Sequence, residues 1–286
     1  MRKIVVIGAK GQLGSEFQYL EKNYPSFQFY FYDVAEMDIV NRELVEKGIA
    51  ELKPDYLINC AAYTAVDKAE TEKELAFAIN SDAVKNLALS CSKHSVHFIH
   101  ISTDYVFDGE ATQPYQENSV LNPTNVYGQS KLKGEEEALN ADKEVIIIRT
   151  AWVYSPYGNN FVKTMLRLMN SKPDIRVVAD QYGSPTYAYD LAMAIMDIIT
   201  SGKWVPGIYH FTNEGVISWF DFAEQIKNIR KLSSTIHAIT TEEYPMPAKR
   251  PKYSVLDKTK IQKTYSIELR NWRNSLKECL ARIPVE

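Results

Sequence analysis

Two side chains that can move a proton stand four residues apart, Tyr127 and Lys131. Positions i and i+4 lie on one face of a helix, so the phenol and the ammonium meet without help from the rest of the fold. A nearby ammonium favours the phenolate and lowers the pKa of a tyrosine from its usual value near 10. We therefore predict that Lys131 lowers the pKa of Tyr127; a drop to about 7 would bring the phenol near the optimum for proton donation at neutral pH.

A third polar group, the Thr103 hydroxyl, follows the apolar run Val96–Ser102. It can hold and orient a carbonyl oxygen while Tyr127 delivers the proton. Tyr-x-x-x-Lys is a short motif, and a chain with 18 tyrosines contains about one such pair by chance. The order of features gives the pair weight, because a glycine loop, an acidic residue and Thr103 precede it. This order predicts a carbonyl reductase or alcohol dehydrogenase that needs no metal ion.

The glycine loop carries Gly8, Gly11 and Gly14 between the apolar run Lys3–Ile7 and a predicted helix over Leu13–Lys22. A strand, glycines and then a helix place backbone N–H groups and the positive end of the helix at a diphosphate. The spacing G-x-x-G-x-x-G differs from the usual G-x-G-x-x-G fingerprint, although the roles of the glycines are the same. The alternative is a plain strand-to-helix turn.

Asp33 ends the second predicted strand, Phe27–Tyr32. A carboxylate at this place accepts hydrogen bonds from the adenosine ribose of a dinucleotide and repels a 2′-phosphate, which favours NADH. Lys10, in the glycine loop, argues weakly for NADPH. We therefore expect NADH or NADPH as the cofactor. The alternative for Asp33 is the start of a turn.

Strands alternate with helices through the first half of the chain, which predicts an α/β fold: a doubly wound parallel Rossmann sheet. Such sheets bind ligands beyond the carboxyl ends of their strands. The further predicted elements are the helices Arg42–Leu52, Asp67–Ser90 and Tyr127–Leu139 and the strands Tyr56–Cys60, Val96–Ser102 and Val145–Arg149.

Prolines and glycines divide the second half into shorter elements. We expect residues 1–150 to form the dinucleotide-binding Rossmann domain and residues 151–286 to form a smaller C-terminal substrate-binding lobe, with part of 175–195 returning to the first domain. Helices are predicted over Asp190–Thr200, Ser218–Ile229 and Trp272–Leu280.

Composition excludes several classes of protein. The chain has 286 residues and a net charge of −3 with no long basic run, which argues against nucleic-acid binding. It begins without a signal peptide and lacks an apolar stretch of about 20 residues, so we expect a cytoplasmic protein with no membrane partner. The three cysteines form no disulfide or metal pattern, and we expect no metal site.

His97 and His100 are interpreted as sheet or surface residues.

Several longer stretches of the sequence carry a family resemblance. Together they resemble the extended short-chain dehydrogenase/reductase superfamily and, more closely, the dTDP-4-dehydrorhamnose reductase family, over nearly the whole chain. The stretches are residues 59–70, 102–109, 125–128, 149–154, 159–161, 180–186 and 250–251.

The resemblance implies a reaction, the reduction of the 4-keto group of dTDP-4-dehydro-6-deoxy-L-mannose by NAD(P)H to give dTDP-L-rhamnose. It implies Thr103, Tyr127 and Lys131 as the catalytic trio, and Thr103, Asp104 and Trp152 as contacts of the nucleotide sugar. With the glycine loop and the strand ends, the predicted cofactor-binding set is Gly8, Gly11, Gln12, Leu13, Gly14, Asp33, Asp38, Ile39, Ala61, Ala62, Tyr63, Thr64, Tyr127 and Lys131.

The chemistry of three predicted substrate residues also suggests a role for each, together with a structural alternative. The indole of Trp152, after the fifth strand, can pack on a sugar or base, or it can be a core residue. Asn160 can bind sugar or diphosphate oxygens, or cap the following helix. Arg250 offers a guanidinium that suits the diphosphate, or a stem that packs on a loop.

Two rival functions remain. Another nucleotide-sugar reductase, an epimerase or a 4,6-dehydratase can use the same scaffold, although related dehydratases carry Asp-Glu where this chain has Asp104 and Tyr105. The second rival function is that of a non-catalytic regulatory subunit, similar to the regulatory subunit of methionine adenosyltransferase. The sequence does not fix the oligomeric state, and a homodimer is the assembly that we consider.

Overall fold

The structure is a computed structural model that describes residues 1–284. Its centre is a parallel sheet of six strands in the order β10-β5-β4-β3-β1-β2. The chain leaves β1 for β2 on one side and then crosses to β3 on the other, so the strand order reverses beside β1. The strands are β1 (Arg2–Ile7), β2 (Phe27–Tyr32), β3 (Tyr56–Asn59), β4 (His97–Thr103), β5 (Ile146–Thr150) and β10 (Gly207–His210).

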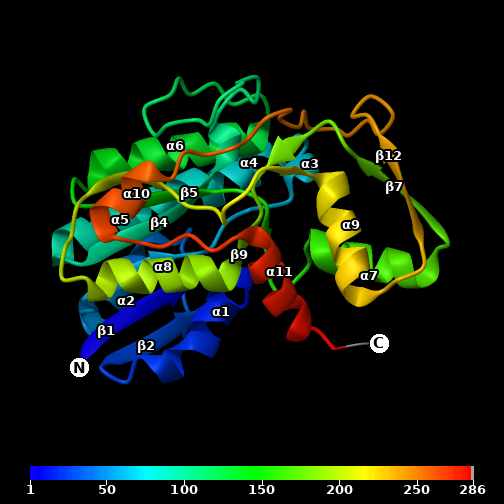
Figure 1. The fold of residues 1–286 in the computed structure, drawn as a ribbon. Helices are drawn as coiled ribbons and strands as arrows, with labels where there is room; N and C mark the ends of the chain where they lie inside the picture. Colours follow the sequence, from blue (N-terminus) through cyan, green and yellow to red (C-terminus); the bar gives the residue numbers. More distant parts are fainter. Residues whose placement is uncertain (285–286) are drawn as a thin grey trace.

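Helices cover both faces of this sheet, which confirms the predicted doubly wound α/β fold (Figure 1). Side chains alternate across a strand. In β1, Val5 and Ile7 pack with α2 (Arg42–Leu52), α5 (Ala83–His94) and α6 (Val126–Ala141). Ile4 and Val6 pack on the other face with α1 (Gln12–Leu20) and α8 (Ala188–Thr200). A strand that is buried on both faces reads as a continuous apolar run, as the sequence of β1 does.

A smaller lobe lies to one side of the sheet (Figure 1). Its core gathers apolar side chains from three helices and several short strands, among them Val162, Phe222 and Trp272. The elements of the lobe are α7 (Phe161–Ser171), β7 (Asp174–Val178), α9 (Trp219–Arg230), β12 (Thr235–Ile239) and α11 (Trp272–Ala281). Short strand pairs join β6 (Val153–Tyr154) to β9 (Thr186–Tyr187) and β8 (Tyr182–Gly183) to β11 (Ile217–Ser218).

The chain crosses between the two parts more than once. Strand β10 pairs with β5 and completes the sheet. Helix α8 covers a face of that sheet together with α1, and α10 (Thr259–Tyr265) packs beside β10 through Ile261 and Tyr209. Residues 188–211 therefore belong to the sheet-bearing part, which extends the predicted return of 175–195 further along the chain.

The predicted helix over Asp67–Ser90 is interrupted. The structure divides it into α3 (Val66–Ala69), α4 (Lys73–Phe77), a π-helical turn over Ala78–Asp82 and α5. A π turn widens the helix by one residue and turns a side chain away from the regular face, and such turns are frequent at functional sites. Here the turn carries Asn80, which is buried.

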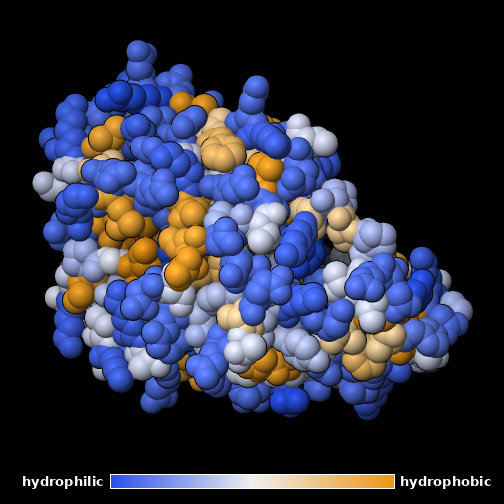
Figure 2. Space-filling model, turned by 90° about the horizontal axis from the view of Figure 1, so that it is seen from above, coloured by the Kyte–Doolittle hydropathy of each residue, from blue (hydrophilic) through white to orange (hydrophobic). Residues whose placement is uncertain are grey.

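No helix of residues 1–284 is long and apolar enough to cross a bilayer. Seen from above, the surface has a hollow where the sheet-bearing part meets the lobe, bordered mostly by hydrophilic side chains (Figure 2).

Candidate active site

The carboxyl ends of the parallel strands bring distant residues to one edge of the sheet. Ile7 lies beside Asn59, Asn59 beside His100, and Thr103 beside Thr150 in register. The residues that follow each strand therefore face the same space, as the sequence predicts. This edge holds the glycine loop after β1, Ala61–Thr64 after β3, Thr103 and Asp104 at the end of β4, and Trp152 after β5.

The glycine loop is packed so closely that side chains are excluded. Gly8 has a φ of +78°, and a Cβ on it would lie 2.6 Å from the backbone nitrogen of Ala61. A Cβ on Gly14 would overlap the carbonyl oxygen of Gly8. No side chain caps the start of α1 at Gly11, so the first-turn N–H groups of Gln12 and Leu13 are available to an anion. The loop therefore fits the diphosphate of a dinucleotide.

Asp33 lies against this loop. Its Oδ2 accepts a hydrogen bond from the backbone nitrogen of Lys10 (3.0 Å), and its Oδ1 accepts one from the backbone nitrogen of Val34 (2.9 Å). The carboxylate is half-buried at the end of β2, where an adenosine ribose would reach it. Asp38 stabilises the next turn by accepting from Val40, and Ile39 is buried behind it.

Asn80 holds the segment after β3 in place, a role that the sequence analysis did not predict. Its Oδ1 accepts from the backbone nitrogen of Tyr63 (2.9 Å), and its Nδ2 donates to the carbonyl oxygen of Tyr63 (3.0 Å) and to Ser130 Oγ (2.9 Å). One buried amide thus links Ala61–Thr64 to the helix of Tyr127. Only the π turn places Asn80 there, and no sequence spacing signals such a turn.

The first turn of α6 fixes Tyr127. Asn125 caps the helix, with its Oδ1 accepting from the backbone nitrogen of Gly128 (2.8 Å), and Glu70 accepts from the backbone nitrogen of Val126 (2.9 Å). The Tyr127 ring is 9% exposed and packs edge-on against the Tyr105 ring, with the ring centroids 5.5 Å apart. The phenol is therefore held at the ligand edge, close to Thr103.

The predicted effect of Lys131 on Tyr127 is wrong. Burial raises the pKa of Tyr127 to about 12, and a hydrogen bond with the Thr103 side chain offsets only part of the rise. The causes of the shift are burial, the Thr103 hydrogen bond and the charge of Asp104, and Lys131 is not among them. Its Nζ instead donates to the carbonyl oxygen of Ile101 (2.7 Å) and lies 3.4 Å from Nε2 of His100. Sharing a helix face brings the two residues near each other but does not decide the partner of the amine.

Thr103 and Asp104 form a buried pair. Thr103 Oγ1 donates to Asp104 Oδ1 (2.9 Å), and burial raises the pKa of Asp104 to about 6. Asp104 Oδ2 and the Ser254 hydroxyl are both buried. The hydroxyl lies close enough to the carboxyl to lower its pKa, against the larger effect of burial. Ser254 follows the predicted stretch 250–251 closely but lies 150 residues after Asp104, and no spacing in the sequence shows that the two residues meet.

Trp152 adopts a strained backbone, with a φ of +49°. Its indole stacks on Trp219 from α9, with the ring centroids 3.5 Å apart and the planes 11° apart. Gly183 leaves room for the ring, since a Cβ there would lie 2.7 Å from it. Strain of this kind gathers at functional sites. The stack joins the sheet edge to the lobe, and Trp219 is a residue that the sequence analysis did not single out.

The two remaining predicted substrate residues, Asn160 and Arg250, both form hydrogen bonds with other side chains of the protein. Asn160 caps α7 by accepting from the backbone nitrogen of Lys163 (3.1 Å), and it donates to Oε1 of Gln12 (2.9 Å). Arg250 donates to Oδ2 of Asp67 (2.6 Å). Both residues border the ligand edge, Asn160 through Gln12 of the glycine loop and Arg250 through α3, and their contact with substrate stays a prediction.

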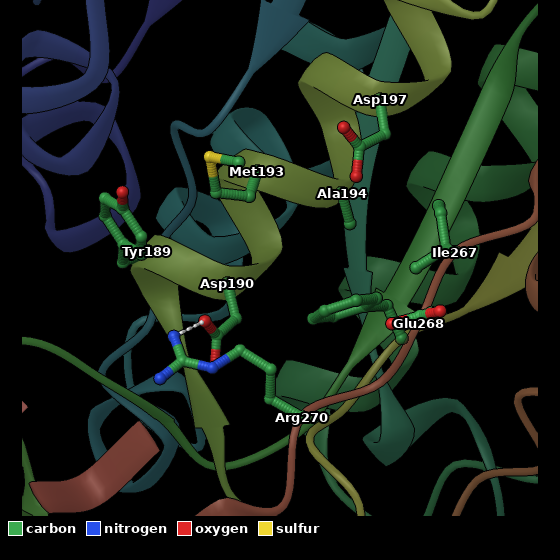
Figure 3. Close-up of a pocket in the computed structure, with 9 residues that line it drawn as sticks. Tyr189, Asp190, Met193, Ala194, Asp197, Ile267, Glu268 and Arg270 are labelled. Atoms are coloured by element: carbon green, nitrogen blue, oxygen red, sulfur yellow. Dashed lines mark hydrogen bonds and ion pairs between the residues drawn. The ribbon is translucent and has the colours of Figure 1, made fainter. Parts of the chain in front are cut away.

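A pocket of about 200 Å³ lies elsewhere, between α8 and the segment Ile267–Arg270 (Figure 3). None of the predicted site residues lines it. Asp190 accepts from Arg270 (2.7 Å) and from Asn213 (2.6 Å) beneath it, so the polar groups there tie α8 to the lobe. Within residues 1–284, no cluster of three or more His, Cys, Asp or Glu side chains is arranged to hold a metal ion.

Comparison with known sequences gives one consistent family. Residues 1–285 match the family model described as RmlD substrate binding domain. A dTDP-4-dehydrorhamnose reductase of Aggregatibacter actinomycetemcomitans is 42% identical, over 98% of this chain and 99% of its own length. The spore coat polysaccharide biosynthesis protein SpsK of Bacillus subtilis is 41% identical, over 98% of this chain and 97% of its own.

Comparison with solved structures gives the same family. A dTDP-4-dehydrorhamnose reductase of Clostridium acetobutylicum, 42% identical, superposes with a TM-score of 0.93 over 98% of each chain. The Bacillus anthracis protein of the same name, solved in complex with NADP, is 37% identical with a TM-score of 0.94, over 98% of this chain and 99% of that one. A dTDP-glucose 4,6-dehydratase from Bacillus anthracis has a TM-score of 0.83 at 19% identity, which is a likeness of fold alone.

Proposed function

Because the chain belongs to the dTDP-4-dehydrorhamnose reductase family, we infer that it reduces the 4-keto group of dTDP-4-dehydro-6-deoxy-L-mannose with NAD(P)H to give dTDP-L-rhamnose. This is the last step in making that activated sugar. The observation that carries the inference is the buried group of Thr103, Asp104 and Tyr127 at the sheet edge, beside a glycine loop that fits a dinucleotide.

The residues divide the chemistry between them. When bound beside the glycine loop, a nicotinamide cofactor would supply the hydride for the carbonyl carbon. Tyr127, a neutral phenol at its raised pKa, gives its proton to the carbonyl oxygen, so the product is an alcohol. The Thr103 hydroxyl orients that oxygen, and it is itself fixed by its bond to Asp104. The buried walls exclude water, which strengthens these hydrogen bonds.

We propose that the sugar lies between the sheet edge and the lobe. Asp104 and Ser254, which lie together and are buried at this edge, are suited to sugar hydroxyls. The Trp152–Trp219 stack offers an aromatic face, and apolar faces of sugars and bases pack well on indoles. Arg250 and Asn160 complete the proposed substrate set at the rim.

A different nucleotide-sugar reductase is the nearest rival. A probable dTDP-4,6-dihydroxy-2-methyloxan-3-one 4-ketoreductase of Streptomyces antibioticus is 36% identical over 98% of this chain. An elimination of water is less suited to this site, because Asp104 is followed by Tyr105, whose pKa burial raises further, and not by a second carboxylic acid.

The deciding experiment measures oxidation of NADH and of NADPH with dTDP-4-dehydro-6-deoxy-L-mannose and identifies the product by mass spectrometry and NMR. Formation of dTDP-L-rhamnose supports the proposal. Tight dinucleotide binding without turnover would favour a regulatory subunit instead, and reduction confined to another keto sugar would favour the rival reductase.

A homodimer in the cytoplasm completes the proposal. The outer faces of α1 and α8 carry the aromatic side chains Tyr19 and Tyr189, whose rings are in contact and partly exposed. Sedimentation velocity of the purified protein tests the assembly, and cell fractionation tests the location. A monomer across the micromolar range would remove the dimer from the proposal.

A further inference from the structure

Residues 248–254, which we call the strap, lead the chain from β12 back toward α10. In Figure 1 this stretch is drawn in orange and passes α3 on its way. It forms backbone hydrogen bonds with two separate parts of the molecule. Tyr253 donates its N–H to the carbonyl oxygen of Gly109 (3.0 Å), and Ser254 donates its N–H to the carbonyl oxygen of Tyr182 in β8 (2.8 Å). The strap therefore connects the segment after β4 with a short strand beside the lobe.

The strap ends at Ser254, next to two predicted substrate contacts. Burial raises the pKa of Asp104, and a hydrogen bond with the Ser254 side chain opposes the rise, so the two groups lie close together. A Cβ on Gly183 would lie 2.9 Å from the Ser254 hydroxyl and 2.7 Å from the Trp152 indole. Ser254 is thus a neighbour of both Asp104 and Trp152, and a shift of the strap would change the shape of the proposed sugar site.

Asp67 of α3 holds the other end of the strap with both of its carboxylate oxygens. Oδ1 accepts from the backbone nitrogen of Ala248 (3.2 Å), and Oδ2 accepts from Nη2 of Arg250 (2.6 Å). The Asp67 and Arg250 side chains are only 29% and 19% exposed, so water and salt screen their attraction less than that of a surface pair. Because both partners donate, Asp67 must present two acceptors, which a carboxylate does and an amide does not.

The neighbouring residue of the strap, Lys249, forms an ion pair of the ordinary surface kind. Its Nζ lies 3.1 Å from Oε1 of Glu110, and the two side chains are 57% and 51% exposed. Exposed pairs of this kind contribute little to stability. Adjacent residues of one segment therefore carry a partly buried pair and an exposed pair, which gives a matched comparison.

Helix α3 gives Asp67 a fixed place at the ligand edge. The first residue of the helix donates its N–H to the carbonyl oxygen of Thr64 (2.9 Å), the last residue of the predicted cofactor segment after β3. Just past the end of the helix, Glu70 accepts from the first backbone nitrogen of α6 (2.9 Å), one residue before Tyr127. A short helix that is bonded at both ends sets the position of Asp67, and through it the position of the strap relative to Tyr127.

We propose that Asp67 is a positioning residue for the nucleotide sugar, which fixes the strap so that Ser254 stays beside Asp104 and Trp152. The carboxylate acts on the substrate only through the strap and does not touch the reacting atoms. What the strap binds rests on the proposed reductase function. The hold of Asp67 on the strap is measured without substrate, so the two proposals can fail separately.

Hydrogen exchange of the purified protein, followed by mass spectrometry on peptides that span the strap, measures this hold. Asp67→Asn leaves either the Ala248 N–H or the Arg250 guanidinium facing a second donor. We expect the amide protons of the strap to exchange at least about tenfold faster in this variant. Glu110→Gln removes the exposed pair of the same segment and should change the rates by less than about twofold.

Two outcomes of the exchange experiment overturn the proposal. One is a strap that exchanges equally fast in Asp67→Asn and in the wild type. The other is faster exchange throughout the chain, with the buried strand β1 included, because that would show a general loss of stability and no specific hold on the strap.

Steady-state kinetics separate positioning from a purely structural role. Asp67→Asn should raise KM for the nucleotide sugar at least about tenfold while kcat at saturation stays within about threefold, the pattern of a lost binding interaction. In an Arg250→Met background the same substitution should add less than about twofold, because the asparagine oxygen then accepts from Ala248 with no second donor to satisfy. A fall in kcat at unchanged KM, or effects of the two substitutions that simply multiply, would contradict the positioning role.

Discussion

Gly14 lies so close to Gly8 that a methyl group on Gly14 would overlap the Gly8 carbonyl oxygen. The contact joins the first turn of α1 to the end of β1 and sets how near a diphosphate comes to the helix. The overlapping atoms are backbone on both sides, so no side-chain movement relieves them.

We therefore expect Gly14→Ala to weaken dinucleotide binding at least about tenfold and to destabilise the fold by about 1–3 kcal/mol, the usual cost of overpacking. Isothermal titration and urea unfolding measure the two effects. Gly202→Ala is the control, since Gly202 also has a positive φ but has open space around it. It should lose about 1 kcal/mol and bind normally. Normal binding by Gly14→Ala would show that the loop does not hold the cofactor.

Tyr127→Phe removes the proposed proton donor and little else. We expect kcat to fall at least about 100-fold, the usual scale for loss of a general acid, with the dissociation constant of the cofactor nearly unchanged. Stopped-flow kinetics and fluorescence titration measure them. Tyr209→Phe is the matched control, because its hydroxyl donates only to the Val205 carbonyl, at the far edge strand. Near-normal turnover in Tyr127→Phe would mean that another group supplies the proton.

Asp33 should decide between the two nicotinamide cofactors. Its carboxylate is fixed against the loop by the Lys10 backbone and would repel a 2′-phosphate. We expect Asp33→Ser to raise kcat/KM for NADPH relative to NADH at least about tenfold, which corresponds to about 1.4 kcal/mol. The ratio of the two values in paired assays is the measurement. A variant ratio equal to that of the wild type would place the 2′-position away from Asp33.

Asp104 should make the fold less stable as the pH rises. Its folded-state pKa of about 6 lies above the value of 3.8 for an unperturbed group, so the folded protein holds the proton more tightly than the unfolded chain. The associated stability is present below pH 4 and is lost between about pH 4 and 6. It amounts to about 3 kcal/mol for this difference in pKa.

The measurement compares the urea unfolding free energy of wild type and Asp104→Asn at pH 4 and pH 7. Relative to the wild type, the variant should be more stable at pH 7 than at pH 4 by roughly 3 kcal/mol. Because both proteins share all other titrating groups, their contributions cancel in the difference. Parallel pH dependence of the two proteins would show that Asp104 is not perturbed.

The strands were the easiest part of the fold to predict. Strand β1 is buried on both faces and therefore reads as a bare apolar run, and the turn at Gly8 marks its end. The sequence could not predict that Gly207–His210 would complete the sheet. That strand is short and joins β5 from 57 residues further along the chain, and pairing over such a distance leaves no local pattern.

The candidate site, too, could be predicted from the sequence only in part. Tyr127, Thr103 and the glycines follow from strand ends and helix spacing, because those fix which edge a residue faces. The partner of Lys131 did not follow, since it depends on His100 and Asn59 meeting it across two other strands. Ser254 and Trp219 come from later parts of the chain, and only the packed structure brings them to Asp104 and Trp152.

The late position of β10 has a consequence for biosynthesis. Until residues 207–210 leave the ribosome, β5 is an open edge with unpaired N–H and C=O groups. More than half of the chain is made before that edge can close, so the nascent sheet is exposed to pairing with other chains. A fragment cut at residue 150 would keep this edge permanently. Residues 1–150, which form a complete domain in the sequence prediction, therefore depend on residues 207–210 to close the sheet and prevent aggregation.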